Sequence, residues 1–101
     1  MRDYELMVIL DGSLEEKDAK TAVDQYLGGL TAHGGKVANL DHWGKRRFSY
    51  EIRHKTDLRH MTEGYYAVAR LEATPEMTEE LSRVLGLADP VIRHKIVRLA
   101  A

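Results

Sequence analysis

The stretch Gly44-Lys-Arg-Arg-Phe-Ser-Tyr-Glu-Ile-Arg53 joins a cluster of cations to an alternating apolar pattern. Its apolar residues recur with a period of two, which places them on one face of a β-strand: Phe48, Tyr50 and Ile52. The residues between them point to the opposite face: Ser49, Glu51 and Arg53. The pattern predicts a strand with one buried and one solvated face, and we expect Tyr50 and Ile52 to pack in the interior.

Three cations stand just before this alternation: Lys45, Arg46 and Arg47. Like charges this close repel one another, so the cluster is typical of a place where an anion, usually phosphate, compensates them. The plain structural alternative is a strand end whose cations prevent edge pairing. Gly44 allows a bulge beside the cluster. Trp43 is suited either to stacking on a base or to covering the sheet edge.

The same stretch resembles the signature of the bacterial small-subunit ribosomal protein six family. That signature reads Gly, any residue, a basic residue, any residue, Leu, Ser or Ala, Tyr, any residue, Ile and a basic residue. The positions that fit it are Gly44, Arg46, Ser49, Tyr50, Ile52 and Arg53. Phe48 replaces the Leu, a change of size rather than of character. The likeness extends to the opening residues 1–10 and to the order of elements along nearly the whole chain.

The flanking sequence predicts alternating strands and helices. We expect strands over residues 2–10, 36–53, 64–73 and 91–99, with Gly44 dividing the second strand. The first strand should be central, because residues 6–10 are all apolar. The segment from His54 to Glu63 is polar, lacks periodicity and is expected to be a loop.

Two amphipathic helices are expected between these strands. Ser13 and Glu16 have the spacing of a capping box, and the helix after them should run to about residue 33, where Gly34 and Gly35 stop it. Gly28 and Gly29 lie inside that helix, so its last turn is expected to fray or to pack very closely. Thr74 as the cap and Pro75 in the first turn begin the second helix, which should end near residue 86.

This order of elements is the split βαβ unit of ferredoxin-like folds. The expected fold class is therefore α+β, with a four-stranded antiparallel sheet and two helices on one face. At 101 residues the chain is expected to be a single domain covering residues 1–101. The other face of the sheet should be open to RNA or to protein.

Strand alternation assigns side chains to the two faces of the sheet. The third strand should bury Tyr65, Ala67, Ala69 and Leu71 beneath the helices and leave Tyr66, Val68, Arg70 and Glu72 on the open face. On the last strand, Arg93 and Lys95 should face opposite to Ile92 and Ile96. Arg2 and Tyr4 are expected to join the open face from the first strand. Tyrosines beside guanidinium groups can stack bases and bind phosphates, although a plainly solvated sheet face fits the same pattern.

The net charge of −1 conceals a segregation along the chain. Residues 1–35 carry a net −4, residues 36–60 a net +4, residues 61–91 a net −4 and residues 92–101 a net +3. Two basic blocks between acidic ones predict a bipolar surface with modest affinity of its own for nucleic acid. The absence of cysteine suits a reducing compartment, and we expect neither a signal peptide nor a membrane span.

No motif indicates catalysis or metal binding. The histidines match no familiar ligand spacing: His33, His42, His54, His60 and His94. None of the serines lies in a nucleophile elbow, and no phosphate-cradling glycine motif occurs. We expect no enzyme activity, no cofactor, no metal and no small-molecule substrate.

The family resemblance implies a structural component of the bacterial 30S ribosomal subunit. It implies binding to the central domain of 16S rRNA together with small-subunit ribosomal protein eighteen, in the cytoplasm, by a chain that is a monomer when free. From charge and strand phase, the candidates for rRNA contact are Arg2, Lys45, Arg46, Arg47, Arg53, Arg93 and Lys95. Which of these contact the partner protein instead stays open.

Two readings from other classes remain. A dimeric ferredoxin-like enzyme or small-ligand-binding protein would enclose a pocket between two open sheet faces and form a tight homodimer. A generic protein-interaction module would bind a partner irrespective of RNA. Size in solution and RNA dependence separate these readings from the ribosomal one.

Overall fold

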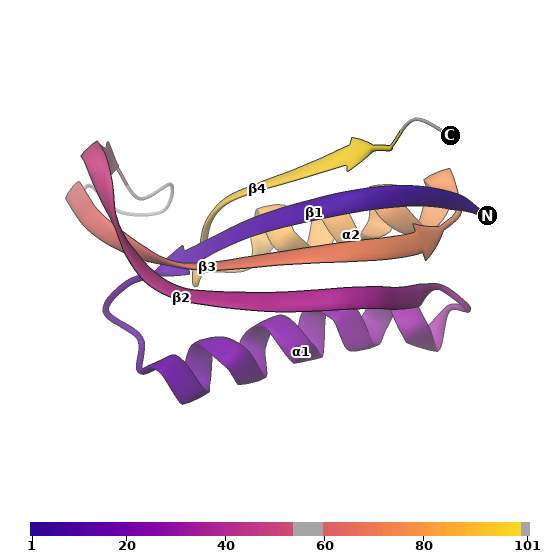
Figure 1. Ribbon diagram of the computed structural model, residues 1–101, viewed down its shortest axis with the longest axis horizontal. Helices are drawn as coiled ribbons and strands as arrows, with labels where there is room; N and C mark the ends of the chain where they lie inside the picture. Colours follow the sequence, from indigo (N-terminus) through magenta and orange to yellow (C-terminus); the bar gives the residue numbers. More distant parts are fainter. Residues whose placement is uncertain (54–59, 100–101) are drawn as a thin grey trace.

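The computed structural model describes residues 1–53 and 60–99, and its description of side chains stops at Arg47 and resumes at Glu63. The elements follow the order β1 (Arg2–Asp11), α1 (Glu16–Ala32), β2 (Lys36–Arg53), β3 (His60–Ala73), α2 (Pro75–Leu87) and β4 (Val91–Arg98). In Figure 1 the two ends of the chain lie at one end of the sheet, and the β2–β3 hairpin curls away at the other. The predicted order of elements is confirmed.

All four strands form one antiparallel sheet in the order β2-β3-β1-β4. Both helices cover the same face, α1 against β2 and β3 and α2 against β4 (Figure 1). This is the predicted ferredoxin-like split βαβ arrangement, and β1 is central as its apolar run predicts. None of the helices in the described ranges is both long and apolar enough to cross a lipid bilayer.

The core lies between the sheet and the two helices. Alternate residues of the central strands are buried in it, among them Leu6, Val8, Tyr65 and Leu71, each at most 2% exposed. From α1 and α2 the helical spacing brings buried side chains onto them: Val23, Leu27, Leu30, Leu81 and Leu85. Burying one such side chain contributes about 1.5–3 kcal/mol, so this face accounts for most of the stabilising apolar burial.

The start of α1 differs from the prediction. The N-cap residue is Glu15, which makes no capping bond with its side chain, and the helix begins at Glu16. The hydroxyl and the backbone N–H of Ser13 both donate to Asp11 Oδ1, at 2.8 and 2.9 Å. The predicted capping box is therefore wrong, because the carboxylate at the end of β1 competes for Ser13 and organises the connecting turn.

The other helix ends agree with the sequence. Gly34, with φ of +95°, follows α1 in the left-handed conformation that glycine adopts without steric cost. Thr74 caps α2, where its hydroxyl oxygen accepts from the Met77 N–H at 3.3 Å, and Pro75 occupies the first turn.

The segment predicted as a loop is shorter than expected. Strand β3 begins at His60, so residues 60–63 continue the ladder with β2, in which Arg47 pairs with Glu63 and Arg53 with His60. The polar residues His60, Thr62 and Glu63 hid this extension, because a strand is predicted from alternating apolar residues and these positions supply none. Residues 54–59 of the expected loop lie outside the described residues.

Candidate nucleic-acid interface

Strand β2 changes direction at Trp43 and Gly44. The register with β3 slips by one residue between His42 and Gly44, which is a β-bulge, and Gly44 has φ of +83°. The predicted break at Gly44 is confirmed. Beyond the bulge, β2 and β3 curl together away from the main sheet (Figure 1), and this hairpin carries the three consecutive cations.

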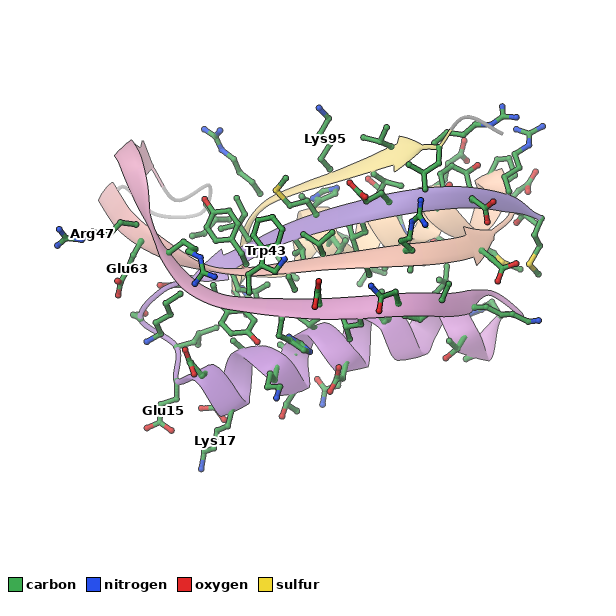
Figure 2. All side chains as sticks on the ribbon, viewed as in Figure 1. Glu15, Lys17, Trp43, Arg47, Glu63 and Lys95 are labelled. Carbon is green, nitrogen blue, oxygen red and sulfur yellow. The ribbon has the colours of Figure 1, made fainter. Side chains whose placement is uncertain are left out.

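Two of the three cations are exposed to solvent. Arg46 and Arg47 are exposed and Lys45 is half-buried, and Arg46 Nη1 donates to the Lys45 carbonyl at 3.1 Å. Figure 2 shows Arg47 extending from the hairpin away from the body of the protein. One carboxylate stands near this group as well, since Glu63 pairs with Arg47 in the ladder.

Four signature positions cannot be placed at the level of side chains. The backbones of Ser49, Tyr50, Ile52 and Arg53 belong to β2, but their side chains lie outside the described residues. The packing of Tyr50 and Ile52 and any rRNA contact of Arg53 stay predictions.

The register defines what lines the open face, because residues directly opposite in an antiparallel sheet point to the same side. The row nearest the hairpin contains Gly44, Tyr66, Ile9 and Arg93. The next two rows contain Asp41, Val68, Met7 and Lys95, and then Asn39, Arg70, Glu5 and Val97. The last row contains Lys36, Glu72 and Asp3.

An apolar patch crosses this face. The indole of Trp43, which is the bulged residue, stacks on the Tyr66 ring with centroids 6.3 Å apart and planes 12° from parallel. Trp43, Met7 and Val97 are 45%, 37% and 43% exposed, which is unusual for large apolar side chains. Figure 2 shows Trp43 in front of the sheet, on the side away from α2. We call Trp43, Tyr66, Val68, Met7 and Val97 the sheet patch.

The charged residues around the sheet patch are balanced. The four rows hold the carboxylates Asp3, Glu5, Asp41 and Glu72 and the cations Lys36, Arg70, Arg93 and Lys95. A face with equal numbers of both signs offers no strong field to a polyanion, whereas a mixed polar rim around exposed apolar groups is typical of protein interfaces.

The predicted rRNA candidates do not form one surface. Lys45, Arg46 and Arg47 lie together on the hairpin, whereas Arg93 and Lys95 lie on β4, the opposite edge of the sheet. Figure 2 shows Lys95 pointing outward from β4, well away from Arg47. Arg2 is at the far end of β1, next to the chain terminus, and pairs with Ala73.

Three assignments of residues to the faces of the sheet are wrong. Tyr4 is 7% exposed and belongs to the core beneath the helices, in the same phase as Leu6 and Val8, so it does not join the open face. Arg2 shares this phase and does not join the open face either. Ile92 lies on the open face, where it packs with Ile9 and Tyr66. The reason is a second bulge: Ile9 pairs with Arg93 but Leu10 with Val91, so strict alternation fails at Ile92.

His42 and His94 take part in structural contacts. The Tyr65 hydroxyl and His42 Nδ1 are 2.7 Å apart, and His42 Nε2 lies 3.8 Å from Asp24 Oδ1 on α1. Burial raises the pKa of Tyr65, and the charges of Glu16 and Asp24 raise it further. Ser82 Oγ and His94 Nε2 are 2.9 Å apart between α2 and β4. No group of three or more potential ligand side chains gathers in the described part of the chain in a way that could hold a metal ion.

A family model described as Ribosomal protein S6 matches residues 3–98, nearly the full length. The chain belongs to the ribosomal protein S6 family. Its membership agrees with the signature around Gly44 and with the observed order of elements.

Several relatives carry the name small ribosomal subunit protein bS6. The protein of Beutenbergia cavernae is 45% identical over 98 residues, covering 97% of this chain and 96% of its own. Those of Salinispora tropica and Rhodococcus opacus are both 48% identical and also cover 97% of this chain, which corresponds to 96% and 97% of their own lengths.

The solved structures agree with the sequence comparison. The crystal structure of 30S ribosomal protein S6 from Thermotoga maritima superposes with a TM-score of 0.83 at 25% identity, covering 97% of this chain and 87% of that one. The family places the chain among the structural proteins of the small ribosomal subunit, and therefore in the cytoplasm, and not among enzymes. The predictions of family, fold, location and lack of enzyme activity are confirmed.

The sheet patch was only partly anticipated. Alternation assigns Tyr66 and Val68 correctly to the open face, whereas the sequence allows two roles for Trp43, stacking on a base or covering the sheet edge. Met7 was missed, although the period-two series Asp3, Glu5, Met7 and Ile9 contains the signal. The stack of Trp43 on Tyr66 could not be read from the sequence, because it depends on the bulge at residue 43.

Proposed function

We propose that the chain binds the central domain of 16S rRNA jointly with small-subunit ribosomal protein eighteen, through two separate surfaces. Residues 1–101 act as one domain that carries both surfaces, and the free chain is a monomer. The hairpin cations contact rRNA phosphates, and the sheet patch docks the partner protein. The single observation that carries the proposal is the separation of the exposed cations from a neutral, apolar open face.

The RNA surface is small. Lys45, Arg46 and Arg47 are the exposed or half-exposed cations of the hairpin whose side chains are described, and each neutralised phosphate adds roughly −0.7 to −0.9 to the slope of log affinity against log salt. About three such contacts give weak binding at physiological salt. The acidic residues of α1 and α2 on the other side of the sheet oppose any second contact with RNA.

The partner surface has the composition of a protein interface. Aromatic residues and methionine are enriched at such interfaces, and the sheet patch supplies Trp43, Tyr66 and Met7 on a rigid sheet. Arg93 and Lys95 lie on its rim, so we assign them to the protein partner rather than to rRNA. A basic partner that docks here extends the cationic surface and raises RNA affinity.

The RNA assignment predicts a specific effect of removing two cations. Replacing both Arg46 and Arg47 by Ala should weaken binding of the chain, in the presence of its partner, to a central-domain rRNA fragment. The slope of log affinity against log salt should become less steep by about 1.4 to 1.8, since two phosphate contacts are lost. Affinity measured from 50 to 300 mM salt checks this. The matched control is Lys17→Ala with Lys20→Ala, which removes the same charge from exposed positions of α1. Equal slopes for both double variants would refute the assignment.

A further inference from the structure

A groove runs between α1 and α2, on the face of the molecule away from the sheet patch. Its volume is about 550 Å³, and its apolar lining comes from both helices: Tyr26, Leu30, Met77, Leu81 and Val84. Leu30 and Leu81 are buried at its floor, whereas Tyr26, Met77 and Val84 keep part of their surface open. Apolar side chains of neighbouring helices therefore stay accessible here.

Gly29, the second of two consecutive glycines in α1, forms part of the α1 side of this groove. Gly28 and Gly29 lie within the helix, are exposed, and have no heavy atom within 4 Å of the position that an added Cβ would take. Each costs the helix about 1 kcal/mol relative to Ala. Apart from the backbone of α1 itself, no heavy atom among the described residues packs closely against these two positions, so the close packing expected as one alternative is not found there. Bare helix backbone allows another chain to approach closely.

The rim of the groove is negatively charged. Glu76 and Glu80 stand on the α2 side, while Gln25 and His33 supply the α1 side. Asp89 lies near Tyr26. Burial raises the pKa of Tyr26, and the charge of Asp89 raises it further. Arg83 bonds to Glu80 through Nε at 2.9 Å and Nη2 at 2.5 Å, so this cation offsets the charge of Glu80.

We propose that this groove docks an amphipathic α-helix of a second protein, with an apolar stripe flanked by lysine or arginine. A groove between two packed helices accepts a third helix by ridges-into-grooves packing. The apolar stripe of that helix covers the five apolar lining side chains, and its backbone lies over Gly29. Its cations meet the carboxylate of Glu76, because Arg83 already bonds to that of Glu80. This surface is independent of the sheet patch and of the hairpin cations.

The binding test uses the whole chain and a synthetic peptide. The peptide has about 18 residues, with Leu at helical positions i, i+3, i+4 and i+7 and Lys beside this stripe. Titrated into ¹⁵N-labelled protein, it should shift the amide signals of Gly29, Leu30 and Met77 and leave that of Met7 unchanged. A peptide with Glu in place of every Lys should bind at least about tenfold more weakly.

Matched variants separate the groove from general attraction between opposite charges. Glu76→Lys should weaken the basic peptide about tenfold, whereas Glu79→Lys, the same change on the same helix outside the groove, should alter it less than about twofold. Gly29→Leu should also weaken binding about tenfold while leaving the helix intact. Leu favours the helical conformation, and its side chain fills the open space above residue 29.

Three results would overturn the proposal. The first is the absence of shifts at the groove, or shifts centred on the sheet patch. The second is equal weakening by Glu76→Lys and Glu79→Lys. The third is a set of groove shifts that depends on protein concentration alone, because a second copy of this chain would then be the occupant.

Discussion

The contact between Tyr65 and His42 shows how one polar pair fixes the position of a buried ring. The Tyr65 side chain is 2% exposed in the core, and its hydroxyl reaches His42 on β2 at 2.7 Å. The hydroxyl donates to Nδ1 when the imidazole proton is on Nε2, the nitrogen that faces Asp24. A buried hydroxyl without a partner would be costly, so His42 allows a tyrosine at this core position.

Removing this hydroxyl should have a measurable cost. Tyr65→Phe should lower the free energy of unfolding at pH 7 by about 1 kcal/mol, because one intramolecular hydrogen bond is lost while His42 can still reach water. Urea unfolding checks the value. Unchanged or increased stability would show that the bond contributes nothing to folding.

The same variant should change the dependence of stability on pH. The raised pKa of Tyr65 means that its hydroxyl stays protonated in the folded state after it has ionised in the unfolded chain. Its contribution is therefore complete below about pH 10, the unfolded value, and is lost as pH rises through the folded value. Between pH 9 and 11 the variant should lose less stability than the parent chain, and a parallel loss would contradict the assigned shift.

At the scale of the element, α1 and α2 differ in how well their sequences suit a helix. Helix α2 has a threonine cap and a first-turn proline, whereas α1 lacks a side-chain cap and contains Gly28 and Gly29. Tertiary packing of the buried face of α1 compensates for the missing cap and the two glycines, as is usual for helices in folded proteins.

The surroundings of the glycines in and after α1 predict opposite effects of the same substitution to alanine. Gly28→Ala and Gly29→Ala should each raise the free energy of unfolding by about 1 kcal/mol, because both are helical and open to solvent. Gly35→Ala should destabilise, since its Cβ would lie 2.7 Å from Leu30 Cγ. Urea denaturation of the three variants checks the set, and destabilisation by Gly28→Ala or Gly29→Ala would show that these glycines serve the fold itself.

Element types could be predicted from this sequence, whereas two element ends could not. The helices and strands follow from periodicities of 3.6 and two, and Thr74 and Gly34 mark helix ends by local chemistry. Ser13 has equally good capping chemistry, yet its hydroxyl donates to Asp11 and does not cap α1. The start of β3 at His60 was hidden, since a curling hairpin needs no apolar alternation.

At the scale of the molecule, the arrangement of the sheet keeps the cationic and apolar surfaces apart. The bulge at Trp43 turns the hairpin and its cations away from the sheet, and the same bulge places the indole on Tyr66. Alternation predicted most of the open face. It did not predict that Tyr4 lies off this face or that Ile92 lies on it, because both positions depend on register and bulges. The charge blocks indicated two basic regions, and only the register shows that they lie on opposite edges.

The measurement that tests this account most directly is salt-titrated binding to a central-domain fragment of 16S rRNA, with and without ribosomal protein eighteen. We expect weak binding by the chain alone, since few of its cations face one way, and much tighter, salt-sensitive binding once the partner occupies the sheet patch. Equally tight binding by the chain alone, or no binding even with the partner, would contradict the division between an RNA surface and a partner surface.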